Sequence, residues 1–199
     1  MISSATFHVI TTELVVGSFA MAGVCFFVKA LQSFNVLNSE KSSQVCDIVG
    51  HFALGFGLIA TPFAIASGIS SSPGSDVSSP LLVNKIFLSM IATGLTIAAI
   101  YARYSIGEQI WASKLSSVTQ SSTGLAASGF MLLTASAGGK FTRNESLVDI
   151  LNLPYDTILL MPSWASGVIL VIGLATTVLA VLGLRAVSYT HLRAHETDS

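Results

Sequence analysis

The chain has 199 residues, of which 52% are hydrophobic and 10% are charged, and its formal net charge is −1. Soluble domains carry roughly a quarter charged residues, so the composition excludes an ordinary soluble domain and predicts an all-α, polytopic transmembrane helix bundle. No basic run and no glycine-rich phosphate loop occurs, which predicts that nucleic acid is not a partner. The two cysteines, Cys25 and Cys46, are too few for a disulfide scaffold.

Five apolar runs have the roughly 20 residues that a helix needs to cross a bilayer. They cover residues 7–28, 48–69, 81–101, 118–138 and 160–184. Turn-forming residues in "SSSPGSDVSSP" separate the second run from the third. We therefore expect five spans with a four-helix core, in one domain over residues 1–186.

Lysine and arginine near the ends of the runs predict the orientation, since such residues gather on the cytoplasmic side. Most of them fall on one side of the membrane, namely Lys29, Lys41, Arg103, Lys114 and Arg185. Lys140 and Arg143 fall on the other side. We expect a multi-pass protein of the cell membrane with its N-terminus outside.

The segment 106–115 between the third and fourth runs predicts a short interfacial helix. Ile106, Ile110, Trp111 and Leu115 recur at helical spacing. Tryptophan is enriched at the level of the lipid headgroups. We therefore expect Trp111 to face that region.

The last residues, 187–199, are expected to be non-native. Eleven consecutive residues, "VSYTHLRAHET", match one reading frame of the transposon-end adaptor used in sequencing libraries. Such a segment carries no information on fold or function. On this interpretation the natural sequence beyond Ala186 is not represented.

A polar group near the outer end of the first and third runs is a candidate intramembrane site. Glu13 lies about 9 Å into the first run and Lys85 about 6 Å into the third, at the helical rise per residue. Ionisable side chains within a membrane are costly unless they are paired. Either the two residues form only an ion pair, or they build a proton or ligand site together with His8 and Thr12.

Two histidines remain once the tail is set aside, and they open their runs from opposite sides. The helix between His8 and His51 rises about 30 Å, so one haem iron in one protomer cannot bind both. A copy of either histidine could still meet its equivalent across a dimer axis. Gly55 lies one turn from His51, which leaves room either for a flat cofactor or, as we favour, for close helix packing.

Small residues at four-residue spacing predict which helices approach each other closely. Ala53 and Gly57 do so in the second run, as do Gly124 and Ser128 in the fourth. Such positions let backbones come together where lipid offers no hydrophobic contrast. The second and fourth helices are therefore expected to be central.

Three segments resemble a family of small bacterial and archaeal four-helix membrane proteins. They are "HVITTELVVGSFAMAG", "LLVNKIFLSMIATGLTIAAIYARY" and "TASAGGKFT". The family, domain of unknown function 2231, is distantly similar to two-haem b-type cytochromes. The resemblance implies a four-helix bundle linked to b-type haem or quinone, although such cytochromes use four histidines.

Three functions follow from these observations. The first is a non-enzymatic membrane subunit or scaffold, within a homo-oligomer or a larger membrane complex. The second is a redox subunit that binds b-type haem or quinone. The third is a small transporter that uses Glu13 and Lys85. No set of residues predicts a catalytic site or a defined metal site.

Overall fold

A computed structural model describes residues 3–71, 80–145, 149 and 171. The chain divides into two compact units, Met1–Ile158 and Leu159–Ser199. All helices discussed below belong to the first unit. Apart from residue 171, the expected fifth span falls outside the described residues, as does the whole tail 187–199.

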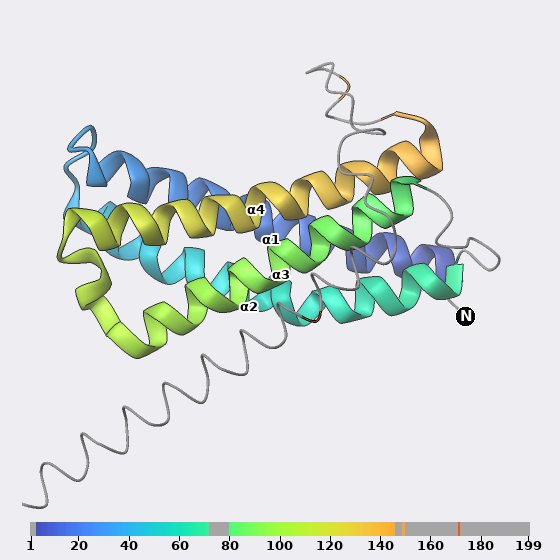
Figure 1. Ribbon diagram of the computed structural model, residues 1–199, viewed down its shortest axis with the longest axis horizontal. Helices are drawn as coiled ribbons and strands as arrows, with labels where there is room; N and C mark the ends of the chain where they lie inside the picture. Colours follow the sequence, from blue (N-terminus) through green and yellow to red (C-terminus); the bar gives the residue numbers. More distant parts are fainter. Residues whose placement is uncertain (1–2, 72–79, 146–148, 150–170, 172–199) are drawn as a thin grey trace, which may run out of the picture. The chain divides into compact units, whose positions relative to one another are not determined.

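Four long helices run alternately in opposite directions (Figure 1). The described regular structure is entirely helical, which confirms the all-α prediction. The elements are α1 (Ser4–Ser33), α2 (Glu40–Ser71), α3 (Pro80–Ile106), η1 (Gly107–Trp111) and α4 (Lys114–Arg143). We call the end of the bundle that carries residues 34–39 and 107–113 the loop end.

Side chains and backbone at the helix ends define where two of the helices stop and start. The Ser3 hydroxyl accepts from the Thr6 N–H at 3.2 Å to begin α1, and Ser113 caps α4 in the same way. Such caps satisfy N–H groups that have no partner within the helix. Asn144 ends α4 with a left-handed backbone, φ 59°, and its N–H binds the Lys140 carbonyl.

Glycines on α2 and α4 receive phenylalanine rings from α1. A Cβ atom at Gly57 would lie 2.7 Å from the Phe19 ring, and one at Gly124 would overlap the Phe26 ring. Accordingly, α1 packs along both α2 and α4, α4 also packs along α3, and α2 and α3 touch much less. The expected close approach at these small positions is present, but α1 and α4 are the helices that each pack along two neighbours, so α2 is not central.

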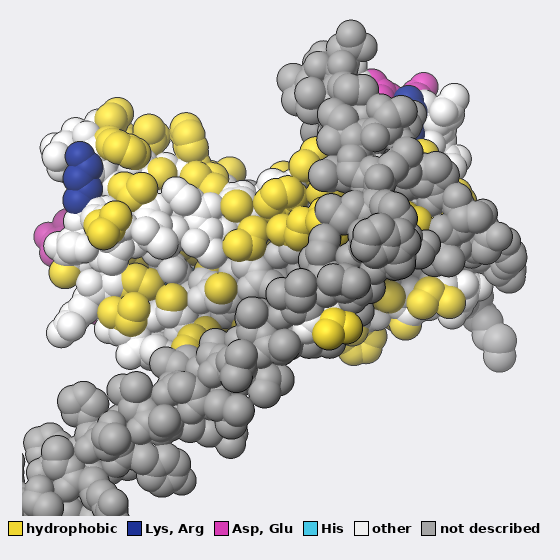
Figure 2. All heavy atoms as spheres, viewed as in Figure 1, with side chains coloured by type: hydrophobic (Ala, Val, Ile, Leu, Met, Phe, Trp, Pro, Cys, Tyr) yellow, Lys and Arg dark blue, Asp and Glu magenta, His cyan; other side chains and the backbone are white. Residues whose placement is uncertain are grey.

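The interior of the bundle holds both hydrophobic and uncharged polar side chains, whereas many large hydrophobic side chains lie on its outside. Large hydrophobic side chains such as Phe52 and Ile69 are 74% and 73% exposed. In the view of Figure 2, charged side chains gather at the two ends, with hydrophobic and neutral side chains between them. Most polar side chains that are buried are uncharged, namely Thr11, Thr61, Ser67, Asn84, Thr96, Ser117, Gln120, Ser121, Ser128 and Thr134.

Three segments of the described structure are long and apolar enough to cross a membrane: Ser4–Ser33, Glu40–Ser71 and Leu81–Trp111. The fourth expected span corresponds to α4, which does not reach the same hydropathy. Its serine, threonine and glutamine side chains lower the hydropathy, and several of them face the bundle interior. The structure thus supports three of the five expected spans.

We predict that Gly124→Ala lowers the thermal stability of the purified protein, because the added methyl group overlaps the Phe26 ring. Overpacking of this kind costs about 1–3 kcal/mol. Gly129→Ala is the matched control on the same helix, since no atom lies within 4 Å of a Cβ atom there. Thermal unfolding in detergent should show a loss only for Gly124→Ala, and equal effects would contradict this packing.

Candidate functional site

An ion pair between α2 and α3 lies at the loop end. Arg103 Nε lies 3.1 and 3.0 Å from the two carboxylate oxygens of Asp47, and Nη2 lies 2.8 Å from Oδ2. The side chain of Asp47 is only 9% exposed, and that of Arg103 is 25% exposed. The fork of guanidinium donors thus satisfies both oxygens of a carboxylate that has little access to water.

His51 connects this ion pair to α4. Its Nδ1 lies 2.7 Å from the Asp47 carbonyl oxygen and 3.1 Å from Oδ1, one helical turn away. Its Nε2 lies 2.9 Å from Gln120 Nε2, which also donates to the Ala99 carbonyl at 2.8 Å. Because that carbonyl only accepts, the Gln120 atom must be the amide nitrogen. His51 Nε2 is then the acceptor, and the proton of the neutral ring lies on Nδ1.

Aromatic rings and a lysine surround His51. The rings of Phe26 and Trp111 lie at centroid distances of 5.1 and 6.2 Å from the imidazole, both roughly edge-on. Lys29 Nζ lies 3.9 Å from the Trp111 ring centroid and donates to Ser43 Oγ at 2.6 Å. These contacts place a buried lysine beside the network of Asp47, His51 and Gln120.

The expected short helix is present as η1, in which Trp111 is partly buried, and the position of this ring at headgroup level stays a prediction. Its ring packs against the hydrophobic core, and Nε1 is buried near Asp47 without a well-formed hydrogen bond to the described residues. Ile106 and Leu115, from the same segment, are 52% and 79% exposed. The segment therefore turns Trp111 and the buried Ile110 inward, over the end of the bundle, and leaves Ile106 and Leu115 outside.

The geometry around His51 does not suit an axial haem ligand. Both imidazole nitrogens are already hydrogen-bonded, so an iron would have to displace Asp47 or Gln120. Gly55 borders open space and is not a point of close helix packing as we had favoured, since nothing lies within 4 Å of a Cβ atom built there. Among the described residues no cluster of three or more His, Cys, Asp or Glu could hold a metal ion.

His8 belongs to a second polar cluster, far along α2 from His51. Its Nδ1 lies 3.1 Å from Ser67 Oγ, which also lies 3.0 Å from Thr11 Oγ1. Gly68 makes room for the imidazole, because a Cβ atom there would be 3.0 Å from the ring. Thr12 donates to the His8 carbonyl at 2.6 Å. His8 thus contacts α2 near its C-terminal end, where the turn of α1 that carries His8 packs against α2.

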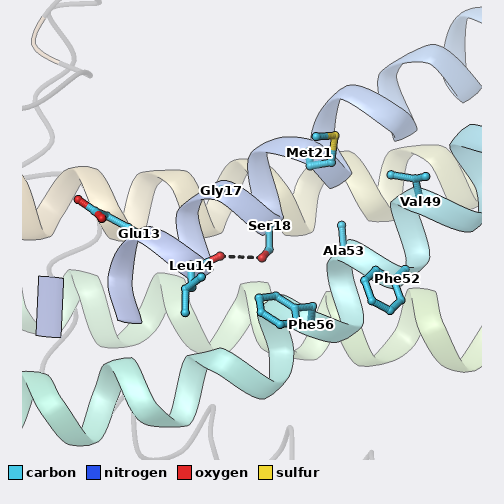
Figure 3. Close-up of a pocket in the computed structure, with 9 residues that line it drawn as sticks. All are labelled: Glu13, Leu14, Gly17, Ser18, Met21, Val49, Phe52, Ala53 and Phe56. Atoms are coloured by element: carbon cyan, nitrogen blue, oxygen red, sulfur yellow. Dashed lines mark hydrogen bonds between the residues drawn. The ribbon is translucent and has the colours of Figure 1, made fainter. Parts of the chain in front are cut away.

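Glu13 and Lys85 are not joined by an ion pair in the described structure. Glu13 is exposed and lines a groove between α1 and α2, where Figure 3 shows its carboxylate pointing away from Phe52 and Phe56. Lys85 instead packs on α4, with Nζ 3.4 Å from the position of a Cβ atom on Gly138. The pairing expected from their matched depth is therefore absent.

Helical phase explains why matched depth did not bring these charges together. The buried residues of α1 include Thr11, Val15 and Phe19, at four-residue intervals. Glu13 is two residues from Thr11, which places it about 200° around the helix. Hence Glu13 points outward, whatever its depth along the axis. Of the four residues of the expected polar site, Thr12 is hydrogen-bonded to His8, and Lys85 lies near enough to His8 to interact with it electrostatically.

The sequence held a signal for Asp47 and Arg103 that was not used. Asp47 directly precedes the second apolar run, four residues before His51, and Arg103 follows the third run at the same side. Opposite charges at the same end of neighbouring antiparallel helices are candidates for pairing.

Comparison with family models, curated proteins and solved structures gives no match for this chain. The resemblance to the four-helix family remains a prediction.

We predict that removing either partner of the Asp47–Arg103 pair destabilises the protein by roughly 3 kcal/mol, since the remaining charge is left in a poorly solvating place. The double variant Asp47→Asn with Arg103→Met should lose less than the sum of the two single variants. Thermal or denaturant unfolding in detergent measures this coupling. Glu108→Gln is the control, because Glu108 is 91% exposed and 4.0 Å from Arg103. If the losses in free energy of unfolding of the two single variants add up to that of the double variant, the two side chains do not stabilise each other.

Proposed function

We propose that the protein is a non-enzymatic, multi-pass membrane protein whose helix bundle serves as a subunit or scaffold. The observation that carries this proposal is the exposure of many large hydrophobic side chains on the outside of the bundle, together with buried uncharged polar side chains inside it. Such a surface is costly in water and suits contact with lipid. Three apolar segments of sufficient length support the same conclusion.

The hydrogen bonds at the loop end support a structural role over a catalytic one. His51 binds Asp47 and Gln120. Asp47 also binds Arg103, and Gln120 also donates to the Ala99 carbonyl. A general base or nucleophile has to reach a substrate with a free atom. Here the polar atoms of the network are used to connect α2, α3 and α4, which is the task of a scaffold.

The charge distribution supports placing the loop end in the cytoplasm and the N-terminus outside. Four cationic residues, Lys29, Lys41, Arg103 and Lys114, lie at or near the loop end. Cationic residues near the ends of spans favour the cytoplasmic side. Lys140 and Arg143 lie at the other end, on the last turn of α4, so the excess is modest.

Cysteine labelling in intact cells tests this topology. In a background of Cys25→Ser and Cys46→Ser, a cysteine introduced by Ser75→Cys should react with an impermeant maleimide. One introduced by Ser39→Cys should react only after the membrane is opened, because residue 39 lies in the loop end. The reverse pattern would overturn the orientation. Recovery of the protein in the soluble fraction would overturn the membrane proposal itself.

Optical absorbance distinguishes a scaffold from a redox subunit. We expect the protein purified from membranes to show no Soret band, because an iron bound to His51 Nε2 would have to displace the hydrogen bond to Gln120. A Soret band that disappears in His51→Gln or His8→Gln would favour the redox alternative. If the protein is instead a small transporter that uses Glu13 and Lys85, the two residues must act separately, because they are not joined by an ion pair in the described structure.

A further inference from the structure

A polar pocket at the loop end is lined by two lysines. It has a volume of about 350 Å³ and lies between the C-terminal end of α1, the start of α2 and the η1–α4 junction. No carboxylate occurs among the described residues that line it. The residues that matter below are Lys29, Gln32, Ser43, Trp111 and Lys114.

Lys29 brings a buried ammonium to this pocket without a carboxylate of the described residues in ion-pairing contact. The residue is 4% exposed. Asp47 attracts it and Arg103 repels it, so the neighbouring ion pair contributes fields of opposite sign. Ser43 and the Trp111 ring are the contacts that stabilise the ammonium. A buried charge is costly unless it is compensated, and an anion in the pocket would compensate it.

Other groups in the pocket have the chemistry to complete an oxyanion site. Lys114 supplies a second ammonium from the first residue of α4, where the partial positive charge of the helix terminus also acts. Gln32 Oε1 is buried and accepts no hydrogen bond from the described residues. That oxygen suits a ligand that also carries a hydroxyl group.

We propose that this pocket binds a ligand that has both a phosphate group and a hydroxyl group. Lys29 and Lys114 hold the phosphate. Two sources share this chemistry: free phosphate, and the headgroup of an anionic phospholipid. Basic pockets between spans on the cytoplasmic side commonly hold such headgroups. The lipid source rests on the membrane placement proposed above, whereas binding of free phosphate does not.

Binding is tested on the full chain, purified in a neutral detergent and stripped of lipid. The probes are inorganic phosphate at constant ionic strength, dioleoylphosphatidylglycerol in mixed micelles, and dioleoylphosphatidylcholine as the zwitterionic control. One readout is the melting temperature, which should rise by roughly 3 °C or more near saturation. The other is the fluorescence of Trp111 in a Trp164→Phe background, because the chain has two tryptophans and Lys29 lies on the Trp111 ring.

Lysine variants then decide whether the pocket is responsible. Lys29→Met and Lys114→Met should each abolish the rise in melting temperature and the fluorescence change. If Lys29→Met does not fold because Lys29 is buried, Lys114→Met still tests the pocket. Lys41→Met should retain both, since Lys41 is exposed at the same end outside the pocket lining. A response to phosphatidylglycerol alone identifies a lipid site, and a response to phosphate alone identifies a soluble anion. No response to either probe, or the same response in Lys29→Met, overturns the proposal even if the topology experiment succeeds.

Discussion

The carboxylate of Asp47, nearly removed from water within α2, constrains the loop end of the bundle more than any other group. A charge in such a place must be compensated and must have its oxygens hydrogen-bonded. Arg103 of α3 does both. Since α2 and α3 otherwise touch little along their length, this pair joins the two helices that the phenylalanine contacts of α1 leave apart.

His51 extends the same constraint to the remaining helix. It is held by the turn of α2 that carries Asp47, and through Gln120 it reaches both α4 and the Ala99 carbonyl of α3. Interhelical hydrogen bonds of this kind contribute modestly one by one in an apolar environment. Here they share atoms, so their loss is expected to be cooperative. The network fixes the relative positions of three helices at one end.

The loop end therefore combines a satisfied network with an unsatisfied pocket. Around Asp47 nearly every donor and acceptor is used, whereas a few ångströms away Lys29 has a hydroxyl and an aromatic face as its contacts. Trp111 borders both regions, because its ring contacts His51 and also lines the pocket. Turning this ring inward protects the ion pair and leaves the lysine facing a cavity, which links the structural role of the network to the proposed binding of a phosphate group.

The sequence by itself determined the helical class, the approximate ends of the four helices, and the placement of His8 and His51 toward opposite ends of the bundle. These follow from hydropathy and the constant rise of a helix, both of which are local. Only the tertiary structure decided that Glu13 points outward, that Phe19 and Phe26 fill the glycine positions, and that Asp47 pairs with Arg103. In a helix such as α1, both the packed face and the outer face are apolar, so the pattern of hydrophobic residues does not reveal which face is buried. Depth can be read from residue number, but direction around the axis depends on how all four helices pack together.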